Sequence, residues 1–357
     1  MDYLNTKECI NNLLQYIQHK ISEITVIFLA NVKNITVNVS DYYDTSIITE
    51  FLSISEYEEL LTALQNYGFY TITYFNVNEF ISDYLAGKYS QEKLVIFEGT
   101  QKGIGHAKDA LIPSFCDLEK LIHTGPNAYA NSICSNKYHW TKLLEFHSIP
   151  VPKSWRYDSN LGWLMGEAPS DDKMLIAKPI YECASIGINC SSVAYYSENY
   201  EKNLKKVSLQ YKQPLIVQEF IEGYEVEVPV IIRKSISYVL PPTILVKDGN
   251  AYMGCSYLDF NNIYEDDYDF CLLETVNRSL VPEIENCAKK IICLLELDGY
   301  IRIDFRIHAE GCYYVTDINS YPHIVKHSSY SYAFKALDFE EKDIIPCLIG
   351  NTIINNS

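Results

Sequence analysis

The sequence predicts a mixed fold, in which an α/β domain is followed by regions of antiparallel sheet (α+β). In the first third, apolar runs at residues 24–32, 70–75 and 94–97 alternate with helical patterns, as in a mainly parallel sheet covered by helices. Near the C-terminal end, residues 301–307 alternate strictly between apolar and polar side chains, and a turn at 308–311 leads into a second strand-like run. That period of two is typical of half-buried strands in a hairpin. A chain of 357 residues is long enough for two or three domains.

Composition and charge argue against several classes of protein. The formal net charge is −17, so we expect no attraction to nucleic acid or to an anionic membrane through charge alone. The 11 cysteines are scattered, without the spacing of a zinc site, and are interpreted as apolar core residues in a reducing compartment. The sequence has no apolar run of the ~20 residues that span a bilayer, and its first residues do not resemble a signal peptide. We therefore expect a soluble cytoplasmic protein.

The first third predicts the elements of one α/β domain. Residues 1–21 have the spacing of an amphipathic helix, and residues 24–32 form an apolar run typical of a strand buried on both faces. Ser55 is predicted to cap a second helix, with Glu58 at the capping-box position. The domain is expected to end near Gly125.

A glycine-containing loop follows the third strand of this domain. Gly103 and Gly105 are similar to the start of a dinucleotide fingerprint, but Lys108 stands at the third glycine position. We therefore interpret the segment as a loop at the carboxyl end of a strand, where such loops line clefts.

The middle of the chain offers candidates for binding phosphate. Lys137 lies in a helical segment at 136–146, where a lysine is also commonly a solvated surface charge. Lys178 ends a short apolar strand, and the loop after it contains Ser185 and Gly187. An ammonium group beside such a loop can bind phosphate together with backbone N–H groups. The spacing is not that of a Walker-type loop.

Two further segments are expected to border a site. Residues 215–221 and 224–232 are predicted to form a hairpin around a glycine, which places Glu225 just past the turn, facing either solvent or a ribose. The acidic, aromatic segment 257–269 has the composition of a loop that closes over a site. A helix at 282–297, which begins with proline, leads into the C-terminal hairpin.

That hairpin contains a candidate metal site. If Ile307 lies opposite Cys312, then Asp304 is diagonal to Asp317, and Asn319 shares the face of Asp317. Two carboxylates and an amide oxygen are suited to Mg²⁺ that carries nucleotide phosphates. The alternative is a solvated polar face without any ligand.

Five segments together resemble the ATP-grasp superfamily and, within it, the D-alanine–D-alanine ligases and their relatives. The similarity extends from about Thr124 to the C-terminus, and its segments occur in the family's order at residues 136–142, 178–187, 218–225, 299–304 and 317–322. The resemblance implies an ATP-grasp fold with three parts. These would be a Rossmann-like N-terminal domain at 1–125, a central lid subdomain at 126–213 and a C-terminal catalytic subdomain with a mixed sheet at 214–357.

The resemblance also implies a binding site for ATP and metal. Lys137 and Lys178 would bind the phosphates, and Glu225 would bind the ribose. Adenine would be bound by Gln218, Glu219, Phe220 and Ile221. Asp304, Asp317 and Asn319 would hold two Mg²⁺ ions, with Mn²⁺ as an alternative. The catalytic group would comprise Arg302, which stabilises the oxyanion, Ser185 in the phosphate loop, and Ser328, which contacts the acceptor's carboxylate.

The implied activity is an ATP-dependent ligase that joins an amino-acid-like carboxylate to an amine through an acylphosphate. Both substrates would be small molecules. Homodimers are common among such ligases, but no residue pattern here indicates one. One alternative is a D-alanine–D-alanine ligase with a divergent first-substrate site. Another is a degenerate ATP-binding protein without ligase activity.

Several departures from the family pattern concern the substrate. Ile263 replaces the family's lysine, whose contact would be missing or supplied elsewhere, for example by Lys326. His323 stands where the family has glycine, and His323 and His327 would either shape the acceptor pocket or be structural. The Gly-Gly-x-Ser-x-Glu segment of the family is absent after the first strand. We therefore expect a specificity different from that of the cell-wall enzyme.

Overall fold

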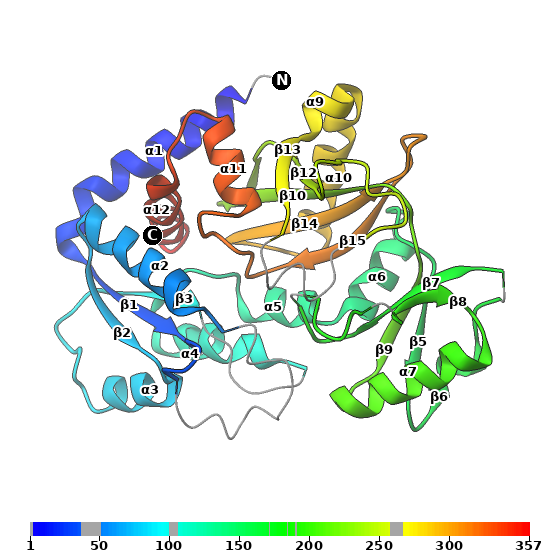
Figure 1. Ribbon diagram of the computed structural model, residues 1–357. Helices are drawn as coiled ribbons and strands as arrows, with labels where there is room; N and C mark the ends of the chain where they lie inside the picture. The colour runs from blue at the N-terminus through cyan, green and yellow to red at the C-terminus, as the bar shows by residue number, and fades with distance from the viewer. Residues whose placement is uncertain are drawn as a thin grey trace.

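Three β-sheets, each built mainly from a different part of the chain, form the framework of the computed structural model (Figure 1). In Figure 1 the first sheet lies at left, the third at upper centre and the middle sheet at right. The structure describes residues 3–36, 51–99, 106–170, 172–183, 185–189, 191–257 and 267–357. The predicted combination of an α/β domain with antiparallel sheets is confirmed.

The first sheet is parallel, and its strands have the order β2-β1-β3-β4. All six residues of its central strand β1 are buried, as the apolar run predicted. The strands are β1 (Thr25–Ala30), β2 (Tyr70–Tyr74), β3 (Leu94–Gly99) and β4 (Ile122–His123). The helices of this part are α1 (Leu4–Lys20), α2 (Ile54–Tyr67), α3 (Val77–Leu85) and α4 (Leu111–Glu119), with short 3-10 turns at Ile21–Glu23 and Lys108–Ala110.

Helix α2 begins two residues earlier than the sequence pattern indicated. Its N-cap is Ser53, whose hydroxyl accepts a hydrogen bond from the Glu56 backbone N–H, and Glu56 completes the capping box. The prediction of Ser55 and Glu58 was wrong because the same spacing of serine and glutamate occurs twice in this segment.

The C-terminal helix α12 (Ile344–Asn355) covers the first sheet together with α1. The two helices pack so closely that a Cβ atom at Gly350 would lie 3.0 Å from the Leu13 carbonyl oxygen. Helix α11 (Ser329–Ala336) and a 3-10 turn at Glu341–Asp343 precede α12. The end of the chain therefore stabilises the domain formed by its beginning.

The middle sheet has the order β6-β5-β9-β7-β8, with α7 (Glu198–Tyr211) packed against it. Its strands are β5 (Ser154–Asp158), β6 (Gly162–Trp163), β7 (Met174–Pro179), β8 (Val193–Tyr195) and β9 (Leu215–Glu219), with a 3-10 turn at Leu164–Gly166. Strand β9 pairs with β5 and β7, although it follows the expected boundary between residues 213 and 214. We therefore propose that the division between the second and third parts falls after β9.

The third sheet has the order β13-β12-β10-β14-β15, with β11 beside β10. Its strands are β10 (Tyr224–Arg233), β11 (Ile236–Val239), β12 (Thr243–Val246), β13 (Asp269–Leu272), β14 (Tyr300–Ile307) and β15 (Tyr313–Asn319). Helices α5 (Ala128–Ser135), α6 (Lys137–Phe146) and α10 (Val281–Leu294) share a core with β10 and β14. Helix α9 (Leu273–Asn277) and a 3-10 turn at Arg278–Leu280 lead into α10.

The predicted hairpin around Gly223 is wrong, because β9 and β10 belong to different sheets. The backbone at Gly223 lies against the end of β14, where a Cβ atom would be 2.0 Å from the Ile307 carbonyl oxygen. With a φ of +149° as well, this position requires glycine. The chain therefore crosses here from the middle sheet to the third sheet.

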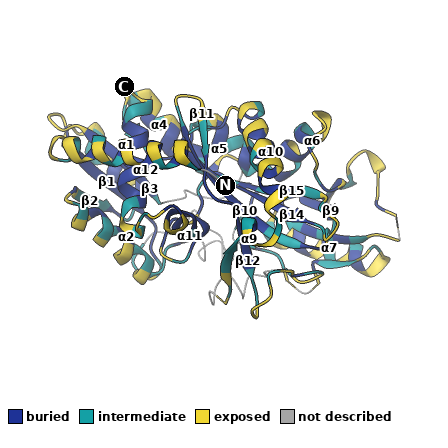
Figure 2. Ribbon diagram, turned by 90° about the horizontal axis from the view of Figure 1, so that it is seen from above, coloured by how far each residue is buried: buried dark blue, intermediate teal, exposed yellow. Residues whose placement is uncertain are grey.

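Burial follows the layers of the fold (Figure 2). Strands β1 and β3 are almost entirely buried, whereas the outward faces of α2 and α7 are exposed. Within the described ranges, the structure contains no helix whose length and hydropathy would allow it to cross a membrane.

A buried polar cluster connects the first sheet to the segment after β15. The Glu98 carboxylate, at the end of β3, is 2.8 Å from His123 Nδ1 and accepts a hydrogen bond of 2.7 Å from the Tyr321 hydroxyl. Burial alone lowers the pKa of His123, but the hydrogen bond to Glu98 and the charge of Glu98 raise it by more. The net shift is above the ordinary value of 6.5, so the pair of His123 and Glu98 binds a proton more tightly in the folded protein than in the unfolded chain.

This pair predicts a specific pH dependence of stability. Because the pKa of His123 is higher in the folded state, its stabilisation is complete below about pH 6.5 and is lost as the pH rises through the raised value. The stability difference between the wild type and His123→Asn, measured by urea unfolding, should therefore be larger at about pH 6 than at about pH 9. A difference independent of pH would contradict the ion pair. His308→Asn is the matched control, because His308 lies 3.8 Å from Glu310 on the exposed surface.

Candidate active site

A cavity between the middle and third sheets is lined by almost every residue that the sequence predicted for the site. Among the described residues its lining includes Lys137, Lys178, Ser185, Gln218, Glu219, Phe220, Ile221, Glu225, Arg302, Asp304, Asp317 and Asn319. These residues come from the start of α6, from β7 and β9 of the middle sheet and the loops that follow them, and from β10, β14 and β15 of the third sheet. Of the predicted site residues, only Ser328 does not line the cavity.

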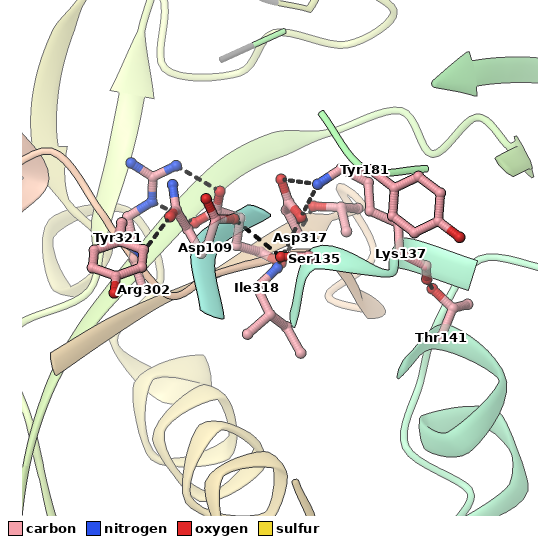
Figure 3. A network of polar contacts seen from close by, with 12 residues as sticks. Asp109, Ser135, Lys137, Thr141, Tyr181, Arg302, Asp317, Ile318 and Tyr321 are labelled. Carbon is pink, nitrogen blue, oxygen red and sulfur yellow. Dashed lines mark hydrogen bonds and ion pairs between the residues drawn. The ribbon is translucent and has the colours of Figure 1, made fainter. Parts of the chain in front are cut away.

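Lys137 and Asp317 form an ion pair across this cavity (Figure 3). Lys137 is the first residue of α6, and its Nζ atom lies 2.8 Å from Asp317 Oδ1 and 3.2 Å from Oδ2. Burial, the largest single influence, lowers the pKa of Lys137, but the charge of Asp317, its hydrogen bond and other nearby acidic groups together raise the pKa by more. Burial likewise raises the pKa of Asp317, but the charges of Lys137, Lys178 and Arg302, together with the hydrogen bond from Lys137, lower the pKa by more. Both groups are therefore charged, and Lys137 is 8% exposed, so the solvated-surface alternative is wrong.

Lys178 differs from Lys137 because no partner neutralises it. Among the described residues, its Nζ atom has no hydrogen-bond acceptor and no carboxylate within ion-pair distance. Burial lowers the pKa of Lys178, and the charge of Asp317 offsets this only in part. A half-buried ammonium group that faces a cavity without a counter-ion is a candidate for binding an anionic ligand.

The loop after Lys178 is shaped by glycine. Gly187 has a φ of +79°, and a Cβ atom there would lie 2.6 Å from the Pro179 Cγ atom. Ser185 also has a positive φ, of 54°. Left-handed residues that alternate with right-handed ones can turn backbone N–H groups toward one side, which is how a loop forms a nest for phosphate.

Arg302 is held by two carboxylates. Its Nε and Nη2 atoms donate to the two oxygens of Asp304 at 2.8 Å, and its Nη1 atom lies 3.2 Å from Glu227 Oε1. Burial raises the pKa of Glu227 to about 7, although Arg302 acts in the opposite direction. The guanidinium group is thus fixed in direction by its bidentate contact and retains N–H groups for a ligand.

Glu227 is a site residue that the sequence analysis missed. It lies opposite Asp304 in the pairing of β10 with β14, and Asp304 lies opposite Asp317 in the pairing of β14 with β15. The three carboxylates form one row across three strands. The alternation of Glu225 and Glu227 with valines in β10 was the signal that could have indicated it.

The hairpin register differs from the prediction. Ile307 lies opposite Tyr313 rather than Cys312, and a bulge at Thr316 shifts the register between Asp304 and Phe305. Asp304 therefore lies directly opposite Asp317 instead of diagonal to it. A bulge adds one residue to one strand and re-aims side chains, and simple alternation does not predict its position.

The donor set fits the metal that the resemblance to the ATP-grasp superfamily implies. Asp304 and Asp317 are opposed carboxylates, and Asn319 adds an amide oxygen on the same cavity wall. Within the described ranges, no cluster of three or more His, Cys, Asp or Glu side chains is arranged to hold a metal by itself. Mg²⁺ is commonly held by one or two carboxylates together with substrate phosphates, so this small set is adequate.

Glu225 and the segment before it are fixed by neighbours that the sequence did not reveal. Glu225 pairs with Arg306 Nη2 at 2.8 Å, and Arg306 also donates to the Ser256 carbonyl oxygen. The backbone N–H groups of Glu219 and Phe220 are already bonded to carbonyl oxygens within the sheet. In the part of the chain that the structure describes, Gln218 Nε2 is buried and lacks a hydrogen-bond acceptor.

Ser328 lies at the start of a helix and does not line this cavity. It caps α11, where its hydroxyl donates to the Val325 carbonyl oxygen and accepts from the Ser331 N–H. His327 lies against Tyr268, with 4.8 Å between the ring centroids. A contact of Ser328 with the acceptor's carboxylate stays a prediction.

Two predicted loops lie wholly or largely outside the described residues. They are the loop with Gly103 and Gly105, and residues 258–266, which include Ile263. Tyr257, just before the second loop, lines the cavity, and its hydroxyl donates to the Asn189 carbonyl oxygen at 2.9 Å.

Comparisons with known proteins agree with this geometry. Residues 174–350 match the family described as "D-ala D-ala ligase C-terminus". The D-alanine–D-alanine ligase of Halothermothrix orenii is 25% identical over 251 residues, which cover 68% of this chain and 70% of the relative. That of Glaesserella parasuis is 24% identical over 282 residues, covering 78% and 85%.

Solved structures show the same fold. The D-alanine–D-alanine ligase from Bacillus anthracis superimposes with a TM-score of 0.68 at 15% identity, covering 92% of this chain and 97% of that one. The ligase from Coxiella burnetii gives 0.61 at 14% identity, covering 93% and 96%. The fold is therefore the ATP-grasp fold. Within that class, the chain is similar to the D-alanine–D-alanine ligases, and its residues 174–350 match the C-terminal part of that family.

The buried ion pair leads to a stability prediction. Asp317→Ala would leave the buried Lys137 ammonium without its counter-charge, so we expect a loss of about 3 kcal/mol in the free energy of unfolding. The double variant Lys137→Met with Asp317→Ala should recover part of that loss, as urea unfolding would show. If Asp317→Ala and the double variant lost the same amount of unfolding free energy, Lys137 and Asp317 would not be energetically coupled. The control is Glu145→Ala on the same helix, where the exposed pair with Lys142 is worth at most about 1 kcal/mol.

Proposed function

We propose that the protein is an ATP-dependent carboxylate–amine ligase that forms an amide or peptide bond through an acylphosphate and releases ADP and phosphate. The observation that carries the proposal is one cavity in which Lys137 and Lys178 face Asp304 and Asp317, with Arg302 fixed beside them. The names of the relatives, which are ligases of this reaction type, support it. The substrates would be a small amino-acid-like carboxylate and a small amine.

In this proposal the phosphates of ATP are bound by the two lysines. Lys178 supplies a positive charge that no carboxylate at ion-pair distance neutralises in the described part of the chain, and the loop around Ser185 and Gly187 supplies backbone donors. This local positive charge explains how a chain with a net charge of −17 would bind a polyanion. The other predicted contacts remain proposals: adenine against the segment from Gln218 to Ile221, and ribose against Glu225.

Asp304, Asp317 and Asn319 would hold Mg²⁺, or Mn²⁺ as an alternative. When bound, such an ion neutralises phosphate charge during transfer of the phosphoryl group. Asp317 would then share its carboxylate between the ion and Lys137, while Asp304 continues to orient Arg302. Carboxylate ligands that are also hydrogen-bonded are the usual arrangement in metal sites.

The proposed reaction has two steps. A carboxylate oxygen of the first substrate attacks the γ-phosphorus, an O–P bond forms, and the bond to the β-phosphate breaks to release ADP. The amine nitrogen of the second substrate then attacks the acyl carbon, phosphate leaves, and the nitrogen loses a proton. Arg302 would donate its remaining N–H groups to the oxyanion of the tetrahedral intermediate, because Asp304 and Glu227 hold it in place beforehand.

A screen of substrates tests the proposed function. The full-length protein would be incubated with ATP, Mg²⁺ and amino acids, singly and in pairs, and ADP release and product masses would be measured. Stimulation of ADP release by a carboxylate, together with a condensed product, supports a ligase, and a product from D-alanine alone would identify the narrower D-alanine–D-alanine activity. No stimulation by any carboxylate would favour a nucleotide-binding protein without ligase activity.

A second test addresses the phosphate contact. Lys178→Met keeps the length of the side chain and removes its charge, so we expect ATP affinity in calorimetry to fall at least about tenfold. Lys142→Met is the control, because Lys142 lies on α6 beside the site but pairs with Glu145 on the surface. Unchanged affinity in Lys178→Met would remove Lys178 from the phosphate site.

A further inference from the structure

Lys108, at the start of the 3-10 turn that leads into α4, is a buried lysine that the function proposed above does not use. Its Nζ atom donates a hydrogen bond of 3.1 Å to Glu182 Oε2, and the side chains of Lys108 and Glu182 are only 1% and 5% exposed. Lysine and glutamate are almost never buried to this extent unless they are paired. The pair connects the first part of the chain to the loop that follows β7.

Glu182 belongs to the loop that the proposed function assigns to the phosphates of ATP. It precedes Ser185 and Gly187 in that loop and lines the candidate active site together with Lys178. Its carboxylate is thus an anion on the wall of a cavity that would hold a polyanion. Like charges repel strongly where little water separates them, so this carboxylate needs compensation. Lys108 supplies the compensating charge without lining the cavity itself.

A second set of contacts fixes the start of the same loop. Gln213 Nε2 donates to Glu182 Oε1 at 2.6 Å, and Gln213 Oε1 accepts from the Tyr181 backbone N–H at 2.8 Å. The Tyr181 ring stacks on His106, with 4.2 Å between the ring centroids. One oxygen of Glu182 is therefore bonded to the middle part of the chain and the other to the first part.

The start of this loop also lies beside the ion pair of Lys137 and Asp317. The Lys137 backbone N–H donates to the Ile180 carbonyl oxygen at 3.3 Å. Figure 3 shows Tyr181 and Asp109, the neighbours of Glu182 and Lys108 in the sequence, in the polar network around that pair. The first part of the chain, helix α6 and the loop after β7 thus meet at one place.

We propose that Lys108 is a positioning residue for ATP: it neutralises Glu182 and holds the loop after β7 in the form that binds the phosphates. The inference rests on the ATP site of the proposed function, which places the phosphates beside this loop. Lys108 acts through Glu182 and does not itself contact the nucleotide. It lies outside residues 174–350, which match the ligase family, so ATP binding would depend on a residue that the family match does not include.

Calorimetric titration of the full-length protein with ATP and Mg²⁺ tests the inference. Lys108→Met removes the charge and leaves the carboxylate of Glu182 without its counter-charge, so we expect the affinity for ATP to fall at least about tenfold. The affinity for adenosine, which has no phosphate groups, should change by less than about twofold. Unfolded protein would lower the fitted stoichiometry rather than the affinity, so partial loss of folding does not imitate this result.

A double variant tests whether the charge of Glu182 is the cause. Glu182→Gln removes the anion and keeps an amide oxygen that can accept from Gln213. Lys108→Met combined with Glu182→Gln should therefore restore the affinity for ATP to within about threefold of the wild type. Lys108→Arg keeps the positive charge and should also stay within about threefold.

Leu94→Ala is the matched control. Leu94 is a buried core residue of β3 in the first part of the chain and does not line the candidate active site. Its replacement should destabilise the first part of the chain and leave the affinity for ATP unchanged.

Every outcome supports or overturns the inference. It is overturned if Lys108→Met binds ATP as tightly as the wild type, if the double variant binds ATP no better than Lys108→Met, or if Leu94→Ala weakens ATP binding equally. The ligase function is judged separately. Wild-type protein that binds ATP but forms no product with any carboxylate would remove the ligase function and leave the role of Lys108 standing, whereas wild-type protein that does not bind ATP would remove both.

Discussion

The ion pair between Lys137 and Asp317 is the interaction on which the candidate site depends. It joins the start of α6 to the end of β15, and it is the reason that two groups which burial would neutralise both remain charged. Removing a charge from water is costly, and only a close counter-charge offsets that cost. The pair thus places a cation and an anion at the same point, where a phosphate group and a metal ion would each find a partner of opposite sign.

The same principle is repeated around the cavity. Arg302 is matched by Asp304 and Glu227, and Arg306 by Glu225, so each buried arginine has a carboxylate at hydrogen-bond distance. Lys178 departs from this pattern within the described part of the chain, because it has no such partner. A protein that buries a charge without compensation usually does so for a ligand, and for this reason Lys178 has a central place in the proposed function.

Much of this arrangement could be predicted from the sequence because it depends on local patterns. The alternation in β14 and the apolar run of β1 indicate strands directly, and the short segments around Lys137, Lys178 and Asp317 have spacings typical of a known family. Those spacings brought together residues from a helix and two different sheets, which no periodicity could have connected. The location of the site was therefore accessible, although the roles of its residues remain proposals.

The features of the structure that could not be predicted depend on contacts between residues that are distant in the sequence. The bulge at Thr316, which places Asp304 opposite Asp317, is decided by the packing of two strands. Strand β9 joins the middle sheet because of its partners β5 and β7, not because of its own residues. The role of Ser328 as the cap of α11 was likewise not visible in its spacing. In the same way, the pair of Lys108 and Glu182 joins residues that are 74 positions apart.

The central claim is that a carboxylate becomes an acylphosphate in the cavity that contains Lys178, Asp317 and Arg302. The most direct measurement uses a carboxylate substrate labelled with heavy oxygen in both of its oxygen atoms. In the proposed mechanism one of these atoms bonds to the γ-phosphorus and leaves with phosphate when the amine attacks. Mass spectrometry should therefore find one heavy oxygen atom in the phosphate released for each amide bond formed. Product formation with unlabelled phosphate would contradict the acylphosphate mechanism.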